Sequence, residues 1–122
     1  MSKMEERRKA VFMLLEFSGD LTAINGELQK FGWDCEKPLA VLEPIHVCRI
    51  LDRFLAGDLS AVQVEDWANS VECRDDIEME ASHEGALENA IFLLANPEIN
   101  FPISPDLAMR IVKGLDGKNG VA

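Results

Sequence analysis

The stretch PIHVCRILDRFLAG, residues 44–57, decides the fold that the sequence predicts. Proline suits the first turn of a helix, and glycine suits the residue just after a helix C-terminus. Between these two signals, apolar residues recur at the spacing of one helix face. That face consists of Ile45, Val47, Cys48, Ile50, Leu51, Phe54 and Leu55. Because so wide an apolar face needs cover on several sides, we expect this helix at the centre of a helical bundle.

The next helix is predicted directly downstream. Ser60 and Gln63 have the spacing of a capping box, in which each side chain binds the other residue's backbone amide. Val64, Trp67, Ala68 and Val71 then repeat on one helix face. The segment between the two helices is therefore a tight corner. A DNA-binding role for this corner is not expected, because its second helix carries acids where bases would be needed.

Two further helices are predicted toward the C-terminus. Ser82 is expected to cap a helix that ends at Asn96, before Pro97. Ser104 and Pro105 open the last helix as N-cap and first helical residue. Several glycines follow, so residues 116–122 are predicted to be a loose tail. The inward faces of the two helices consist of Ala86, Leu87, Ala90, Ile91, Leu94 and Ala95, and of Leu107, Ile111 and Leu115.

Two helices are also predicted toward the N-terminus. Residues 4–17 form the first, with Gly19 as its stop. Asp20 is a good N-cap for the second, which continues to residue 31. The dipeptide Asn25-Gly26 is also a strong hairpin signal, but its flanks do not alternate, so a helix is favoured. Residues 32–43 are predicted to be a loop with an extended stretch.

These elements predict an all-α fold, a compact bundle of about five to six helices. The chain of 122 residues has the size of one domain, and 48% of its residues are apolar, enough for one core. No run alternates over five residues as a half-buried strand would. We therefore expect residues 1–122 to form a single helical domain.

The net charge of −10 excludes several classes of function. Nucleic-acid binding requires a basic surface, and this chain would be repelled by phosphates.

No stretch approaches the length of a membrane span, and no cleavage site follows the short apolar run near the N-terminus. Cys35, Cys48 and Cys73 are odd in number and form no close pair, which favours a reducing compartment. We predict a cytoplasmic protein.

An acid-rich segment is the most distinctive feature of the sequence. Between residues 65 and 88 there are nine acids and a single base, Arg74. A local field of this strength steers a basic partner protein toward the surface. A merely solvated surface is the alternative interpretation. The predicted partner-binding residues are Glu65, Asp66, Glu72, Asp75, Asp76, Glu78 and Glu80.

No catalytic motif or metal site is predicted. Glycine loops, nucleophile elbows and calcium-loop spacing are absent from the sequence, and the cysteines and histidines lack the spacing of zinc ligands. Arg49 and Arg53 are expected to form an ion-pair network with Asp52. No cofactor is expected, and a catalytic role is disfavoured without being excluded.

Two alternatives to a partner-binding role stay open. One is a small enzyme or ligand-binding domain with an unrecognised pocket, for which Trp33, Trp67, His46 and Arg49 are the residues to probe. The other is a homodimer subunit. Ile99, Phe101 and Ile103 alternate in the link before the last helix, so this link is expected to be briefly extended and packed on the bundle or on a second copy.

One part of the sequence resembles a known family. The corner RFLAGDLS (residues 53–60), continuing through VEDWA (residues 64–68), is similar to a segment of small bacterial helical proteins that include colicin-D-like immunity proteins. The resemblance covers residues 50–70, about a sixth of the chain. It implies a helical bundle and an acidic inhibitor that covers the basic active site of a toxin nuclease.

Overall fold

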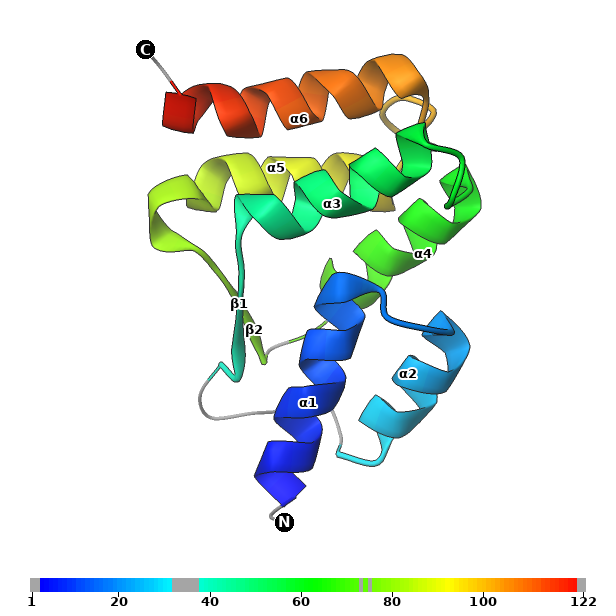
Figure 1. Ribbon diagram of the computed structural model, residues 1–122, viewed down its shortest axis with the longest axis vertical. Helices are drawn as coiled ribbons and strands as arrows, with labels where there is room; N and C mark the ends of the chain where they lie inside the picture. The colour runs from blue at the N-terminus through cyan, green and yellow to red at the C-terminus, as the bar shows by residue number, and fades with distance from the viewer. Residues whose placement is uncertain (1–2, 32–37, 73, 75, 121–122) are drawn as a thin grey trace.

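A computed structural model describes residues 3–31, 38–72, 74 and 76–120. The described residues form six α-helices, one 3₁₀ turn and two short strands (Figure 1). This confirms the all-α class predicted from the sequence. In chain order the elements are α1 (Lys3–Glu16), α2 (Leu21–Gln29), β1 (Ala40–Leu42), α3 (Pro44–Leu55), α4 (Ala61–Glu72), β2 (Ile77–Met79), η1 (Ala81–His83), α5 (Glu84–Ala95) and α6 (Pro105–Gly120).

The helices divide the molecule into two ends. Helices α3, α5 and α6 lie together at the end that carries the C-terminus, whereas α1 and α2 form the end that carries the N-terminus (Figure 1). Helix α4 packs extensively against α5, and α6 packs extensively against α3. Helix α3 contacts α1, α4, α5 and α6, which agrees with the central position expected from its wide apolar face.

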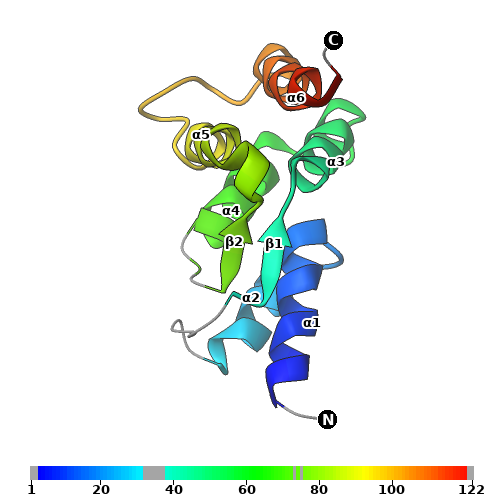
Figure 2. The same cartoon turned by 90° about the vertical axis from the view of Figure 1, so that its left-hand side faces the viewer.

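The two strands lie side by side in the middle of the molecule (Figure 2). They pair in parallel, with Ala40 opposite Ile77 and Leu42 opposite Met79. A parallel pair needs a crossover connection, and here α3 and α4 together supply it. The sequence predicted an extended stretch before residue 44 but not its pairing, because three-residue strands carry too little periodicity to recognise.

One continuous core joins the two ends of the molecule. Trp67 is its largest fully buried side chain, and its Nε1 donates a hydrogen bond to the carbonyl oxygen of Leu14, 2.8 Å away. The predicted stripe of α4 is buried in full, and Cys48 is a small core residue as expected. The core residues of α1 and α2 include Val11, Leu14, Leu15, Ile24 and Leu28, so Asn25-Gly26 lies within a helix and not in a hairpin.

Most of the predicted helix caps are present. At the start of α4, the Gln63 amide donates to Ser60 Oγ at 3.1 Å, and the Ser60 amide donates to Gln63 Oε1 at 2.8 Å. Gly57 has φ +87°, the left-handed conformation that favours glycine after a helix end. Asp20 accepts from the Ala23 amide at 3.1 Å, and Ser104 accepts from the Leu107 amide at 3.2 Å.

Replacement of Ser60 by alanine is expected to lower the free energy of unfolding by about 1 kcal/mol, because one amide of the first turn of α4 loses its acceptor. Asn69→Ala is the matched control on the same helix, since the side chain of Asn69 is exposed and makes no hydrogen bond to a described residue. Urea denaturation of both variants measures the difference. Equal stability of the two variants would show that the cap contributes nothing.

Two predicted helix boundaries are wrong. The helix predicted to begin after Ser82 is preceded by the 3₁₀ turn η1, and α5 begins at Glu84 with His83 as its N-cap. The Ser82 amide donates to Glu80 Oε1 at 2.7 Å instead. At the C-terminus, α6 extends to Gly120, so the predicted loose tail is helical over residues 116–120.

The link between α5 and α6 also departs from its prediction. Only Ile103 packs partly against the core, whereas Ile99 and Phe101 are 72% and 61% exposed. The link forms no strand. Its alternating apolar residues therefore contribute exposed apolar surface, the first indication of a contact with something outside this chain.

Candidate interaction site

The predicted acidic residues do not form a single surface. Asp66 and Glu72 are exposed on α4, and Glu78 is exposed on β2. Glu65 and Glu80 are half-buried. Asp75 lies outside the described residues, and the remaining predicted residue, Asp76, is buried.

The burial of Asp76 corrects its predicted role as a partner-binding residue. Its side chain is fully buried, and Arg74 holds it with two hydrogen bonds, from Nε at 2.7 Å and from Nη2 at 2.8 Å. Arg7 Nε donates a third hydrogen bond at 3.0 Å. Burial opposes ionisation of this carboxyl, but the hydrogen bonds from the two guanidinium groups outweigh burial and lower its pKa. Asp76 therefore fastens α1 to the start of β2.

Sequence reasoning missed Arg7, although a signal was present. Arg7 precedes Val11 and Leu14 by four and seven residues, which places it on the buried face of α1. Its Nη1 donates to the carbonyl oxygen of Phe31 at 3.4 Å, and its Nη2 is buried without a hydrogen bond to any described residue. A charged residue on an apolar helix face indicates a buried partner, but the sequence could not say which acid it was.

Glu80 has a local structural role. It accepts from the Ser82 amide, and its Oε2 lies 2.6 Å from His83 Nδ1. The hydrogen bond with His83 is the main cause of its lowered pKa. Glu80 therefore shapes the η1 turn, and among the described residues of the predicted set the exposed carboxylates are Asp66, Glu72 and Glu78.

His46, a candidate for a ligand pocket, and Arg53, predicted to be in an ion-pair network, both stabilise helix ends. His46 is buried, and its Nδ1 accepts from the Glu43 amide at 2.9 Å as part of the capping box of α3. Burial is the main cause of its lowered pKa. Arg53 Nη1 donates to the carbonyl oxygens of Glu16 and Phe17 at the end of α1. Arg53 also pairs with Asp58 at 3.5 Å, and not with Asp52 as predicted.

The other candidates of the pocket hypothesis do not converge on one site. Arg49 lines a shallow hollow of about 300 Å³ together with His46 and Arg53. Trp67 lies in the core, and Trp33 lies outside the described residues. Within the part of the chain that the structure describes, no three His, Cys, Asp or Glu side chains come together as metal ligands.

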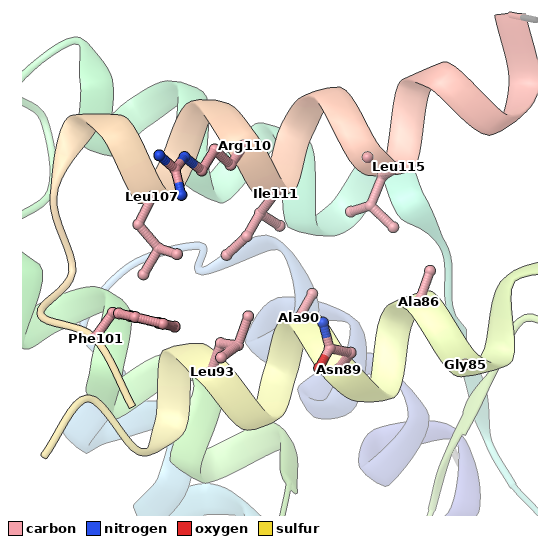
Figure 3. A pocket seen from close by; sticks show the side chains of 11 residues that line it. Gly85, Ala86, Asn89, Ala90, Leu93, Phe101, Leu107, Arg110, Ile111 and Leu115 are labelled. Atoms are coloured by element: carbon pink, nitrogen blue, oxygen red, sulfur yellow. The ribbon is translucent and has the colours of Figure 1, made fainter. Parts of the chain in front are cut away.

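A larger hollow lies between the last two helices, and we call it the α5/α6 groove (Figure 3). Its volume is about 510 Å³. Apolar side chains of α5 and α6 point toward one another across it, and Phe101 of the link closes one end (Figure 3). The lining residues are Gly85, Ala86, Asn89, Ala90, Leu93, Phe101, Leu107, Arg110, Ile111, Gly114 and Leu115.

The α5/α6 groove is open because α6 packs mainly on α3 and only lightly on α5. The facing sides of α5 and α6 therefore stay partly uncovered. Phe101 at one end of the groove is 61% exposed, and an exposed apolar surface of this kind on a small protein indicates a binding site.

Polar groups border the groove. Arg110 pairs with Asp106 across one turn of α6 at 3.2 Å, so these two charges largely neutralise each other. Glu84 and Glu88 are exposed on the adjoining face of α5, without an ion pair to any described residue. The surroundings of the groove are therefore acidic, like the chain as a whole.

No protein-family model, curated protein or solved structure matches this chain. None of the helices in the described ranges combines the length and the apolar character that crossing a membrane requires. A function must therefore be inferred from the site itself, which here means an apolar groove with acidic surroundings.

Proposed function

We propose that this chain is a non-catalytic protein-interaction module that binds a basic partner protein through the α5/α6 groove. The observation that carries the proposal is the exposure of apolar side chains at this groove, above all Phe101 at 61%. Most of the groove lining is apolar, as in sites that bind other macromolecules or ligands.

The apolar surface would supply affinity. Removal of apolar area from water stabilises a complex by about 25 cal/mol per Å², and aromatic side chains dominate the centre of many interfaces. Phe101 stands at one end of the groove and is exposed (Figure 3). Leu93 and Leu107 already wall this end, so a partner side chain that enters it would be surrounded by apolar atoms.

The negative charge would speed association with the partner and favour basic proteins over nucleic acid. A net charge of −10 attracts a basic protein over the distance of a Debye length and repels nucleic acid. Asp66 and Glu72 on α4 and Glu78 on β2 are further exposed carboxylates that contribute to this charge. A basic toxin nuclease, which the resemblance of residues 50–70 implies, is a partner of this kind, and the chain would then act as its immunity-type inhibitor.

Photo-crosslinking tests the proposal in the cells that produce the chain. A benzophenone amino acid replaces Phe101 in one variant and Asn89 in a second, and Glu27 on α2 is the exposed control position at the other end of the molecule. We expect the same basic protein, identified by mass spectrometry, at both groove positions and not at the control. A second copy of the chain at these positions would instead support the homodimer. Groove positions that crosslink no more than the control would refute the proposal.

The contribution of charge can be measured once the partner is identified. Charge reversal of Asp66, Glu72 and Glu78 to lysine is expected to slow association by about tenfold at low salt, because steering acts on the approach of the two proteins. A triple reversal at Glu5, Glu6 and Glu16 makes the same change in net charge on α1, a helix that does not line the groove. Equal slowing by both triple variants would show that the location of the charge is irrelevant.

A further inference from the structure

The geometry points to an amphipathic, cationic α-helix as the occupant of the α5/α6 groove. This inference rests on the proposed function, and it names the structural class of the segment that the partner presents. Three features of the groove carry it: the walls, the glycines at one end and the charges beside it.

The walls favour a helix over an extended peptide. Both walls are α-helices, whose backbone amides and carbonyls bind one another within each helix. They offer no strand edge, so an extended peptide in the groove would leave its own backbone groups without partners. A helix satisfies its backbone internally and needs only apolar side chains that fit between the walls.

The lining residues also have the spacing that helix packing requires. Ala86, Ala90 and Leu93 repeat on α5, and Leu107 and Ile111 repeat on α6, at intervals of three and four residues (Figure 3). Such rows form ridges between which the ridges of a third helix fit. Helix α5 has twelve residues and is about 18 Å long, so a partner helix of about three turns would fill the groove.

The glycines leave room at one end of the groove. Gly85 and Gly114 both line it, and a Cβ atom added to either would meet no atom within 4 Å. Positive φ occurs at Gly19 and Gly57 and at neither of these two, so the backbone conformation does not require glycine here. Without Cβ atoms, the backbone of α5 and α6 is open to close approach by the backbone of a partner helix.

The charged side chains beside the groove favour a partner helix of positive charge. Glu84 and Glu88 adjoin lining residues of α5 and are exposed carboxylates without an ion pair to any described residue, whereas Lys113 adjoins a lining residue of α6 as an exposed ammonium. The flanks of a bound helix would face these carboxylates, so Lys or Arg is expected there. A second copy offering its own α5 would bring Glu84 and Glu88 to the same place, where like charges repel.

Peptide binding to the full chain tests the inference directly. The probe is a fluorescein-labelled 14-residue peptide with Leu at the spacing of one helix face and Lys elsewhere, and binding is measured by fluorescence anisotropy. Two further peptides are a scrambled version, which has no apolar face, and a version with Glu in place of Lys. We expect the first peptide to bind at least about tenfold more tightly than either of the others.

Variants that fill the groove separate specific binding from attraction between a basic peptide and an acidic protein. Gly85→Leu and Gly114→Leu place side chains at the open end of the groove, and each should weaken binding at least about tenfold. Gly26→Leu is the matched control: Gly26 is also an open helical glycine, but it lies on α2, away from the groove. The melting temperature of each variant, measured by circular dichroism, should not fall, because Leu favours helix more than Gly.

Three results would overturn the inference: equal binding of all three peptides, no binding of the first peptide, or equal weakening by Gly26→Leu and the groove variants. Crosslinking then distinguishes a failure of this inference alone from a failure of the proposed function as well. If Phe101 and Asn89 still crosslink a partner, the proposed function stands and the occupant is not a helix. If those positions also fail to crosslink, both proposals fall.

Discussion

Asp76→Asn is expected to lower the free energy of unfolding by about 3–5 kcal/mol, although it removes only one formal charge. The Asp76 carboxylate is fully buried and accepts from both Arg74 and Arg7. Without it, two buried guanidinium groups would lose the charge and the hydrogen bonds of Asp76 while staying out of water. Since small domains are stable by about 5–15 kcal/mol, this is a large share of the total, and urea denaturation measures it.

Two comparisons isolate the cause. Asp66→Asn removes a carboxylate from the exposed face of α4, and its effect should stay within about 0.5 kcal/mol. The double variant Arg7→Met, Asp76→Asn should be destabilised by less than the sum of its two single variants, because the Arg7 guanidinium that loses its carboxylate is itself removed. Strict additivity, or similar losses for Asp66→Asn and Asp76→Asn, would show that the buried cluster does not hold α1 in place.

The same carboxylate sets a pH dependence. The pKa of Asp76 is lower in the folded chain than its ordinary value of 3.8, so its ionised form binds the arginines in the folded state. Its contribution to stability is therefore present above pH 3.8 and is lost as the pH falls from there toward the folded-state pKa. We expect the difference in stability between the unmodified chain and Asp76→Asn to be constant above pH 5 and to shrink below pH 4. A constant difference down to pH 2 would contradict the lowered pKa.

Trp67→Ala is expected to lower the free energy of unfolding by about 3–5 kcal/mol, because it leaves a large cavity between α4 and its neighbours. Trp67→Phe should cost less. It removes the Nε1 hydrogen bond to the Leu14 carbonyl but keeps most of the apolar packing. That carbonyl also accepts from the Phe17 amide at 3.0 Å, so it would not be left without a donor.

Thermal unfolding and urea denaturation measure both Trp67 variants. Ile99→Ala is the control, since Ile99 is 72% exposed, and its effect should stay within about 0.5 kcal/mol. If Trp67→Phe costs as much as Trp67→Ala, the hydrogen bond to Leu14 would dominate over packing. If both Trp67 variants were as stable as Ile99→Ala, Trp67 could not lie at the centre of the core.

Much of the fold could be predicted because the signals act over a few residues. The capping box of Ser60 and Gln63 and the left-handed Gly57 involve neighbours within one helical turn, and the structure has both. The same holds for the buried stripe of α4. The prediction was wrong where two local structures have similar sequence signals. At Ser82 a helix start was predicted, but a 3₁₀ turn precedes the helix.

The candidate site was harder to predict, because it depends on how distant segments meet. The acid-rich segment was evident, but Asp76 within it is buried by Arg7, which lies 69 residues earlier in the chain. The apolar faces of α5 and α6 were predicted as parts of a core. Their packing leaves a groove between them, and no spacing within either helix encodes that outcome.

The sequence by itself determined the helices, most of their caps and the net negative charge, because hydrogen bonds within a turn and apolar periodicity depend only on near neighbours. The tertiary structure alone decided which acid is buried, that two three-residue strands pair across α3 and α4, and that α6 leans toward α3 and leaves α5 partly uncovered. The physical reason is that several helix faces could pack against the same apolar residues. Which faces pack together depends on how all the side chains of the core fit.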